Sequence, residues 1–384
     1  MMGKPKIRFK GYNEDWEQRK LGEVLKERTE RARGGEELLS VTIANGVIRQ
    51  ADSEKRNIAS EDKSNYKIVR KGDIPYNSMR MWQGAVGNSE YDGIVSPAYT
   101  VLVPTDEANA KFFMECFKKE NSLQLFQRWS QGLTSDTWNL KYPTLSSMRF
   151  SMPSIEEQNR IAGDFEQLDN LITLHQHKCD EMKKLKKYML QKMFPQNGKK
   201  VPEIRFDGFT NDWEQRKLGD VVEFLDTMRK PLEGAKRISG PYPYYGASGI
   251  VDYVDGYLFD EELVLLSEDG ANITDRNYPV CFLASGKYWV NNHAHVLKTK
   301  GGNENNFICN SLERKDYKQY NSGMAMPKLN QEVCRGIPIS CPSFDEQKKI
   351  GDYFRNLDHL ITLHQHKCDE LQNLKKYMLQ NMFV

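Results

Sequence analysis

Two pairs of near-identical segments divide this chain into a duplicated framework and two large inserts. The stretches enclosed by the repeats, roughly residues 23–150 and 220–340, are almost unrelated to each other. A chain that duplicates its framework and varies its inserts is predicted to hold two different surfaces on one common frame. The repeated segments are Asp15–Gly22 with Asp212–Gly219, and Leu171–Glu181 with Leu360–Glu370.

Bulk composition limits the classes of partner that this chain can have. Its 384 residues predict two or three domains. The net charge of +2 excludes a protein that contacts a polyanion over its whole surface, so nucleic acid is expected only at local basic patches. The sequence has no run of 18 apolar residues, and its seven cysteines form no Cys-x-x-Cys pair. These features predict a cytoplasmic protein with reduced thiols and no membrane partner.

Each insert is followed by a predicted long helix. Ser154 and Ser343 precede Glu157 and Glu346 by three residues, the spacing of a capping box that begins a helix. Downstream, apolar residues recur in steps of three and four, which predicts a narrow seam between two paired helices. The predicted seam comprises Phe165, Leu168, Ile172, His175, Cys179, Phe354, Leu357, Ile361, His364 and Cys368.

The inserts contain short β-rich segments separated by Gly, Asn and Asp, with helical stretches between them. Val95–Leu102 occupies the same relative place as Val290–Leu297, so the two inserts are expected to share a fold. The predicted fold class is α+β, in which two insert domains alternate with two long helices that pair as an antiparallel coiled coil. The predicted boundaries are 1–152 for the first insert domain, 153–195 for the first long helix, 196–341 for the second insert domain and 342–384 for the second long helix.

The motifs of several common enzyme classes are missing from the sequence. It contains no Walker A loop, no GxGxxG after a strand, no Asn-Pro-Pro-Tyr methylation motif and no HExxH. Their joint absence lowers the expectation that the chain is a self-sufficient enzyme.

Two histidine-containing motifs raise the question of a metal site. On a helix, His175 and His177 lie about 200° apart, so only His175 and Cys179 share a face, and that face is the predicted seam. On a strand, His293 and His295 would share one face, which leaves a metal site open there. Contact with a base or with backbone, or core packing, is favoured instead. We therefore predict no metal ion on this chain.

Predicted loops in both inserts combine side chains suited to nucleic acid. Asn, Gln, Arg and Lys make bidentate contacts to base edges, while Ser, Thr and backbone N–H groups hold phosphates. Ordinary polar loops have a similar composition, so both interpretations stay open on this evidence. The candidate contact residues are Asn77, Ser78, Arg80, Trp82, Gln83, Thr134, Trp138, Asn139 and Lys141 in the first insert, and Tyr244, Tyr245, Ser248, Asp269, Asn272, Asn292, His293, His295, Met324 and Lys328 in the second.

Taken together, these motifs resemble a known family, the specificity (S) subunits of type I restriction–modification enzymes. The resemblance covers the whole length, because variable inserts alternate with repeated helices in the same way. The resemblance is carried by the Trp-Glu-Gln-Arg-Lys-Leu-Gly-Glu/Asp starts, the Pro…Glu-Gln helix starts, the Leu-Asp-x-Leu-Ile-Thr-Leu-His-Gln runs and the Leu-Lys-Lys-Tyr-Met-Leu-Gln-x-Met-Phe helix ends. They lie at 16–23 and 213–220, 153–158 and 342–347, 168–176 and 357–365, and 185–194 and 374–383.

The resemblance implies a non-catalytic protein that reads DNA. Its two insert domains would be target-recognition domains, each reading one half of a split, asymmetric site in double-stranded DNA. Two methyltransferase (M) subunits and two restriction/translocase (R) subunits would assemble on it. Those partners would bind S-adenosylmethionine, ATP and Mg²⁺, and this chain would bind no cofactor. Two other interpretations stay open: a coiled-coil scaffold, or a metal-dependent hydrolase, unrelated to DNA recognition.

Overall fold

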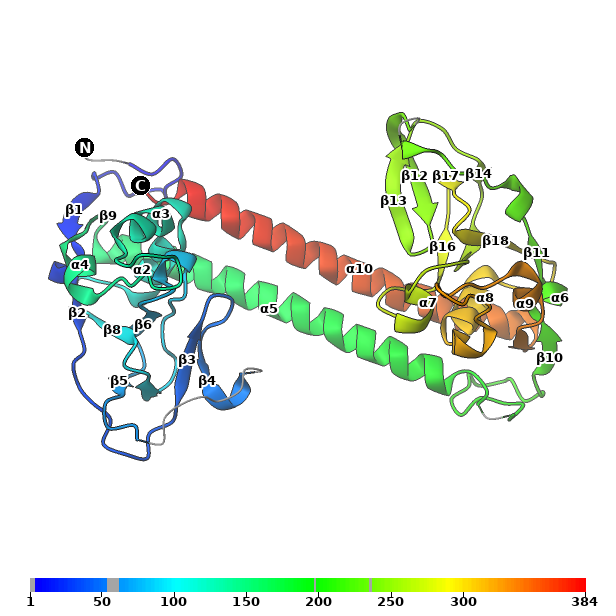
Figure 1. Ribbon diagram of the computed structural model, residues 1–384, viewed down its shortest axis with the longest axis horizontal. Coiled ribbons are helices and arrows are strands. Elements are labelled where there is room, and N and C mark those ends of the chain that lie inside the picture. Colours follow the sequence, from blue (N-terminus) through cyan, green and yellow to red (C-terminus); the bar gives the residue numbers. More distant parts are fainter. Residues whose placement is uncertain (1–3, 54–61, 197, 235–236) are drawn as a thin grey trace. The chain divides into compact units, whose positions relative to one another are not determined.

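A computed structural model describes residues 4–53, 62–196, 198–234 and 237–384 (Figure 1). The chain divides into two compact units. Unit 1 comprises the described residues up to His175 together with Lys367–Val384, and unit 2 comprises Gln176–His366. Strands and helices are mixed in both units, which confirms the predicted α+β class. No helix in the described ranges is long and apolar enough to cross a membrane.

Unit 1 is built from short strands around a helical cluster. A three-stranded sheet has the order β2-β8-β6, and the two-stranded pairs are β3 with β4, β5 with β7, and β1 with β9. Its elements are β1 (Glu17–Lys20), α1 (Leu21–Val24), β2 (Leu25–Glu27), β3 (Leu39–Thr42), β4 (Gly46–Arg49), η1 (Gln50–Asp52), β5 (Lys67–Val69), β6 (Ile74–Asn77), η2 (Met81–Gln83), β7 (Gly93–Val95), β8 (Tyr99–Pro104), α2 (Ala110–Lys118), α3 (Glu120–Trp129), α4 (Tyr142–Ser147) and β9 (Arg149–Met152).

Unit 2 has two four-stranded sheets, with the orders β11-β18-β15-β16 and β13-β12-β17-β14, and a pair of β10 with β19. Its elements are β10 (Glu214–Lys217), α6 (Leu218–Val221), β11 (Val222–Phe224), η3 (Asp226–Met228), β12 (Ser239–Gly246), β13 (Gly249–Val254), β14 (Phe259–Asp260), β15 (Leu263–Ser267), α7 (Asn272–Asp275), β16 (Cys281–Ala284), β17 (Lys287–Val290), β18 (Ala294–Thr299), α8 (Asn305–Glu313), η5 (Tyr317–Tyr320), α9 (Gln331–Arg335) and β19 (Pro338–Cys341).

The long helices α5 (Ile155–Lys192) and α10 (Phe344–Asn381) contribute segments to both units. Within each unit they run antiparallel. The contacts between them show this direction, because residues later in the α5 region contact residues earlier in the α10 region. The contacting pairs are Phe165 with Phe383 and Asp169 with Lys375 in unit 1, and Cys179 with Ile361 and Lys186 with Asp358 in unit 2. Of the predicted seam residues, Phe165, Leu168, Cys179, Phe354, Leu357 and Cys368 are buried, and Ile172, His175, Ile361 and His364 are half-buried.

The repeated glutamates at the helix starts hold the beginning of each repeat. The Glu157 carboxylate accepts two hydrogen bonds from the Arg8 guanidinium, both at 2.7 Å. The Glu346 carboxylate accepts the same bidentate pair from Arg205, at 2.7 and 2.8 Å. Both glutamates are buried, and each carboxylate has a tertiary arginine partner that the capping-box spacing did not suggest.

The glutamines that follow them fix the insert helices. Gln158 Oε1 accepts from the Asn109 N–H at 2.9 Å, and Gln347 Oε1 accepts from the Glu304 N–H at 3.1 Å. Asn109 and Glu304 are the N-caps of α2 and α8. Each framework copy therefore positions the first helix after the central sheet of its insert in the same way.

An aromatic cluster of the same composition lies at the centre of both units. Two of its three rings come from the repeated framework and one from the insert, with centroid distances of 5.3 to 6.3 Å. The insert therefore completes a core that the framework begins. The rings are Trp16, Phe383 and Phe112 in unit 1, and Trp213, Phe194 and Phe307 in unit 2.

The two inserts share a central strand arrangement despite their unrelated sequences. Strands β2, β8 and β6 of unit 1 have the same antiparallel order as β11, β18 and β15 of unit 2. Their register confirms the expected correspondence between Val95–Leu102 and Val290–Leu297. In the ladders, Tyr76 faces Thr100 in unit 1 as Leu266 faces His295 in unit 2. Just beyond the strand ends, Ser78 bonds to Ala98 as Glu268 bonds to His293.

Candidate nucleic-acid interface

Several of the candidate residues gather where β6 ends and β8 begins in unit 1, and where β15 ends and β18 begins in unit 2. At this edge the two units place different chemistry on corresponding backbone positions. Ser78 and Thr100 join their hydroxyls at 2.9 Å in unit 1. The corresponding residues of unit 2 are Glu268 and His295, whose charged groups are 3.7 Å apart. A neutral hydroxyl pair is thus matched by an ionic one.

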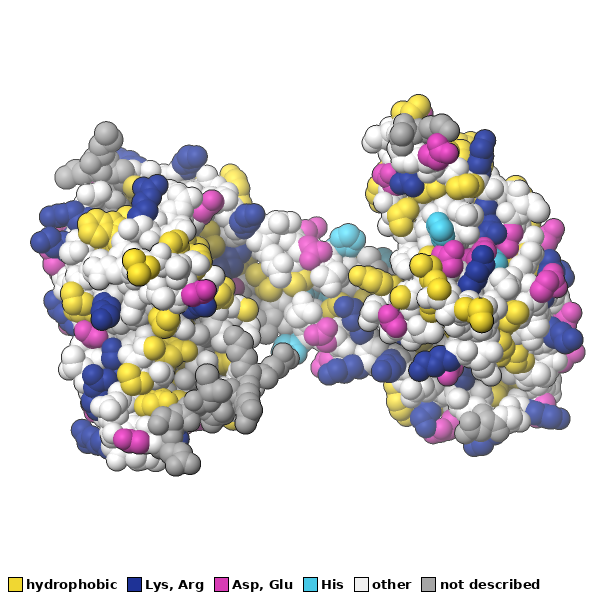
Figure 2. Space-filling model, viewed as in Figure 1, with side chains coloured by type: hydrophobic (Ala, Val, Ile, Leu, Met, Phe, Trp, Pro, Cys, Tyr) yellow, Lys and Arg dark blue, Asp and Glu magenta, His cyan; other side chains and the backbone are white. Residues whose placement is uncertain are grey.

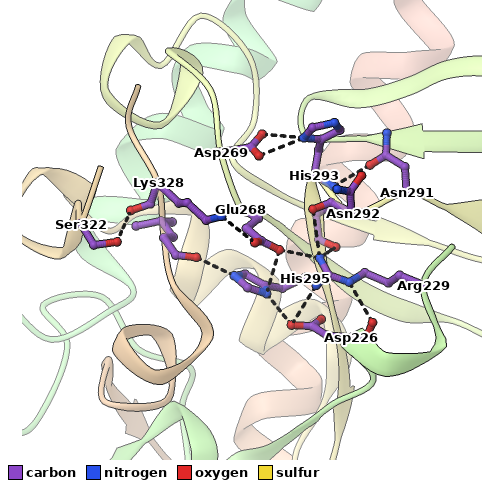
Figure 3. A network of polar contacts seen from close by, with 12 residues as sticks. Asp226, Arg229, Glu268, Asp269, Asn291, Asn292, His293, His295, Ser322 and Lys328 are labelled. Carbon is purple, nitrogen blue, oxygen red and sulfur yellow. Dashed lines mark hydrogen bonds and ion pairs between the residues drawn. The ribbon is translucent and has the colours of Figure 1, made fainter. Parts of the chain in front are cut away.

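His295 is the centre of a buried polar network in unit 2, shown in Figure 3. Its Nδ1–H donates to Asp226 at 2.6 Å, and its Nε2–H donates to the Leu329 carbonyl at 2.7 Å. Burial lowers the pKa of His295, but the hydrogen bond to Asp226 and the adjacent Cys334 thiol outweigh burial and raise it to about 10. Because both ring nitrogens face acceptors, the side chain is an imidazolium at neutral pH.

Arg229 supplies the second positive charge of this network. Its Nη1 donates to Glu268 at 2.6 Å and to the Ala294 carbonyl at 2.8 Å, and its Nη2 lies 3.5 Å from Asp226. Asp226, Glu268 and His295 place their ligand atoms within 4.8 Å of one another, a spacing that a metal ion can use. A metal ion would have to displace both the guanidinium and the imidazolium, which already balance the two carboxylates. The geometry favours an ion-pair network that fixes loops.

Polar side chains form the exposed rim above this network. His293 Nδ1 lies 2.9 Å from both carboxylate oxygens of Asp269, and Lys328 Nζ lies 3.4 Å from Glu268. Asn291 accepts from the His293 N–H at 2.8 Å, and Asn292 is exposed beside it. Figure 2 shows histidine, acidic and basic side chains next to one another on this unit. The predicted residues Asp269, Asn292, His293 and Lys328 therefore lie together at one edge.

Unit 1 carries an open cleft of about 1040 Å³ at the corresponding edge. The hairpin of β3 and β4 forms one wall, and the predicted residues Asn77, Arg80 and Gln83 line another part of it. Ile43 and Met79 add exposed apolar side chains to the same lining. A cleft with amide, guanidinium and apolar groups can contact both base edges and sugar–phosphate backbone.

The remaining predicted residues of unit 1 lie on the loop that follows α3 and on its supports. Trp138 packs edge-to-face on Trp82 at 5.2 Å, Thr134 hydrogen-bonds to Thr137, and Lys141 is exposed. Asn139 joins Gln131 through two backbone hydrogen bonds. Ser78 is buried, and its backbone carbonyl accepts from the Leu140 N–H at the end of this loop.

Other predicted residues of unit 2 are more dispersed. Tyr244 is buried under the Arg237 guanidinium and accepts from the Leu232 N–H, so it belongs to the core. Tyr245 stacks on Phe282, and Asn272 closes a turn through both groups of its side-chain amide. Ser248 is exposed in the turn between β12 and β13, and Met324 is exposed on a loop after η5.

Sequence reasoning missed Asp226 and Arg229 as members of this site. They are three residues apart at one turn, but that turn lies far from Glu268 and His295 along the chain, so no local spacing links them to the rest of the site. His295 was the available signal, because a buried histidine between apolar strand residues requires polar partners. The partners themselves follow only from the register of β11 and β15 against β18.

A family model described as the type I restriction modification DNA specificity domain matches residues 13–184 and 210–373. A putative type I restriction enzyme specificity subunit of Haemophilus influenzae is 34% identical over 154 residues, which is 40% of this chain and 39% of that protein. The type I restriction enzyme MjaVIII specificity subunit of Methanocaldococcus jannaschii is 22% identical over 352 residues, covering 81% of this chain and 78% of that protein.

Solved structures show the same fold. The S subunit of a type I restriction–modification system from M. genitalium matches 100% of this chain and 99% of its own, with a TM-score of 0.71 and 16% identity. A chain from work on complex assembly and conformational transition of the type I system matches 96% of this chain and 97% of its own, with a TM-score of 0.50 and 17% identity.

Proposed function

Because this chain belongs to the family of DNA specificity subunits of type I restriction–modification systems, we propose that its two units read the two halves of a bipartite, asymmetric DNA site. The observation that carries the proposal is the shared register of the inserts with different side chains on it. Ser78 and Thr100 in unit 1 correspond to Glu268 and His295 in unit 2. Two domains with the same strand arrangement but different side chains at corresponding positions are suited to reading two different half-sites.

An insert exchange tests this proposal. Residues 23–150 are replaced by the matching insert of a family member with a different target, and the methylated adenines are mapped by sequencing in cells that also hold the partner subunits. Only one half of the recognised sequence should change. The matched exchange of residues 220–340 should change only the other half. An exchange that alters both halves, or neither, would contradict independent reading by the two units.

The long helices supply the surface for the proposed protein partners. Large apolar side chains remain exposed on them at repeated positions, and each unit has one such set. A duplicated surface is suited to two copies of one subunit, which supports two M subunits, with two R subunits joining the assembly. The exposed residues are Leu171, Leu174, Leu374 and Tyr377 in unit 1, and Leu360, Leu363, Leu185 and Tyr188 in unit 2.

Native mass spectrometry tests the duplicated surface. Leu171→Glu combined with Leu174→Glu should remove one M subunit, and Leu360→Glu combined with Leu363→Glu should remove the other. Thr173→Glu, on an exposed polar position of the same helix, is the matched control and should leave both subunits bound. Retention of both M subunits by the leucine variants would contradict this assignment.

This chain is proposed to be non-catalytic, with S-adenosylmethionine, ATP and Mg²⁺ bound by the partners. Arg229 and His295 support the absence of metal chemistry at the acidic network, because they already neutralise its carboxylates. The purified chain should neither methylate nor cleave DNA, whereas the reconstituted complex should methylate it. Robust hydrolysis by the chain alone, lost on chelation of metal, would favour the hydrolase interpretation.

A further inference from the structure

Corresponding loops follow the helical cluster of each insert. In unit 1 the loop ends at Leu140, whose N–H donates to the Ser78 carbonyl at 2.8 Å. In unit 2 it ends at Leu329, whose N–H donates to the Glu268 carbonyl at 2.7 Å. Both leucines are fully buried. Since Ser78 and Glu268 correspond in register, the first tip loop (131–139) and the second tip loop (322–328) occupy the same place in their units.

Backbone hydrogen bonds close the first tip loop. Gln131 N donates to Asn139 O at 3.1 Å, and Asn139 N donates back to Gln131 O at 2.8 Å. The chain then passes so close to Gly132 that a Cβ there would meet the Thr137 carbonyl at 2.6 Å. Gly132 also has φ +148°, which favours glycine. The loop is therefore tightly folded on its glycine.

The second tip loop is closed in a similar way. Ser322 N donates to Lys328 O at 2.8 Å, and Asn321 Oδ1 accepts from the N–H groups of Gly323 and Lys328, both at 2.9 Å. A Cβ on Gly323 would collide with the Met326 carbonyl. The imidazolium of the buried network holds the end of this loop through the Leu329 carbonyl.

Each tip loop presents a large apolar side chain directly after its glycine. Leu133 and Met324 are both two residues beyond the closing backbone contact, and their relative exposures are 101% and 106%. A single exposed apolar side chain needs no explanation. The same feature at the same position of two inserts with unrelated sequences does need one, since tight closure keeps both side chains away from their own cores.

Each tip loop lies next to residues of the candidate nucleic-acid interface. Asp136 of the first tip loop lies 3.8 Å from Arg80, which lines the cleft of unit 1. Lys328 of the second tip loop pairs through its backbone, in an isolated β-bridge, with Asp269, the partner of His293. Cationic and amide groups can hold the sugar–phosphate backbone on either side of each apolar tip.

We infer that Leu133 and Met324 are wedge residues, each of which inserts its side chain between base pairs at one step of its half-site. Leucine and methionine are among the side chains that enter base steps from the minor groove, partly unstack them and kink the duplex. The inference rests on the proposed function, because a wedge acts only where each unit contacts DNA. It adds two defined sites of DNA deformation, through which flexible steps are selected without hydrogen bonds to bases.

The test uses the chain assembled with its methyltransferase partner and a duplex that contains the methylation site mapped in cells. Binding is measured by titration at fixed salt, bending by energy transfer between labelled duplex ends, and unstacking by 2-aminopurine fluorescence at each step of the half-sites. The variants are Leu133→Ala and Met324→Ala. The controls are Leu133→Met, Ser135→Ala and Met326→Ala, where Met326 is 61% exposed on the same loop as Met324.

Both wedge variants should lose about tenfold or more in affinity for the specific duplex. Each should also remove the 2-aminopurine signal of one half-site only and reduce the bend. The controls should behave like the unmodified protein, and thermal unfolding should be unchanged because neither tip packs in a core. Unchanged bending and stacking signals in the alanine variants would overturn the inference. The inference would also be overturned if the unmodified protein lost the same affinity when thymine in the duplex was replaced by uracil, because that result indicates contact with a thymine methyl group. If the unmodified complex bound no specific duplex, the proposed function itself would fail.

Discussion

Replacing His295 by glutamine tests the ionic network of unit 2 most directly. Glutamine has a similar reach, and its side-chain N–H can still donate to the Leu329 carbonyl. It cannot carry the positive charge that faces Asp226 at 2.6 Å and Glu268 at 3.7 Å. Arg229 would then be the main cation left for two carboxylates inside the unit.

The expected loss of stability follows from the pKa of this imidazolium. It is about 10 in the folded protein, against roughly 6.5 in an unfolded chain, and at about 1.4 kcal/mol per pH unit the difference corresponds to about 5 kcal/mol. Removing one partner of a buried ion pair costs about 3–5 kcal/mol, so we expect about 4 kcal/mol at pH 6. Because the folded pKa is raised, this contribution is complete below pH 6.5 or so and is lost as pH rises through about 10. The difference between unmodified protein and variant should therefore shrink by about 1.4 kcal/mol per pH unit in that window.

Hydrogen exchange of the amides in β15 and β18 measures this difference in unit 2 alone, which avoids treating the whole chain as one two-state system. The variant and the unmodified protein are compared at the same pH from 6.5 to 8.5, so intrinsic exchange rates cancel. Amides in β6 and β8 of unit 1 are the internal control and should not change. A loss below about 1 kcal/mol, or a loss that stays constant with pH, would refute a stabilising imidazolium at this position.

Four further substitutions test the remaining contacts. Lys375→Met leaves Glu115 buried without its ion-pair partner and should cost about 3–5 kcal/mol, whereas Lys186→Met, at the repeated position with a single exposed partner, should cost about 1 kcal/mol or less in thermal unfolding. Equal losses would show that burial of Glu115 does not matter. Arg205→Lys exchanges a bidentate contact for a single one and should lower stability by about 1–3 kcal/mol, measured by urea unfolding; no change would mean that the fork geometry is unimportant. Gly323→Ala should weaken specific DNA binding by the assembled complex while leaving the circular dichroism spectrum unchanged, and full binding would show that tight closure of the second tip loop is dispensable.

The framework was predictable because its signals are local or repeated. The spacing of apolar residues after Ser154 and Ser343 identified both long helices, and the register of Val95–Leu102 against Val290–Leu297 identified a shared insert fold. Side-chain periodicity depends on the geometry of one helix or strand, so a single sequence reveals it. The tertiary partner of Glu157, by contrast, is Arg8, which lies 149 residues before it in the chain.

The site was predictable only in part, for a related physical reason. His293, Asp269 and Lys328 were named from loop composition, and they do lie together. Asp226 and Arg229 were missed because their role depends on how separate strands are aligned, and strand alignment is a non-local property. Met324 was named as a candidate but Leu133 was not, because the correspondence of these two loop residues follows from the shared strand register and from their exposure, neither of which a single sequence shows.

Both ends of each insert are joined to the same small set of framework contacts. Arg8 with Glu157 and Arg205 with Glu346 fasten the flanks, while Gln158 and Gln347 receive the first helix after the central sheet. A foreign insert therefore has to offer an N-cap backbone N–H and an aromatic ring in these places, together with partners for framework charges such as Lys375. In evolutionary terms, genetic exchange can replace a whole insert in one event, without waiting for compensating mutations elsewhere. If the inserts read DNA as proposed, one such exchange would change a half-site at once, whereas point mutations would have to rebuild the contacts residue by residue.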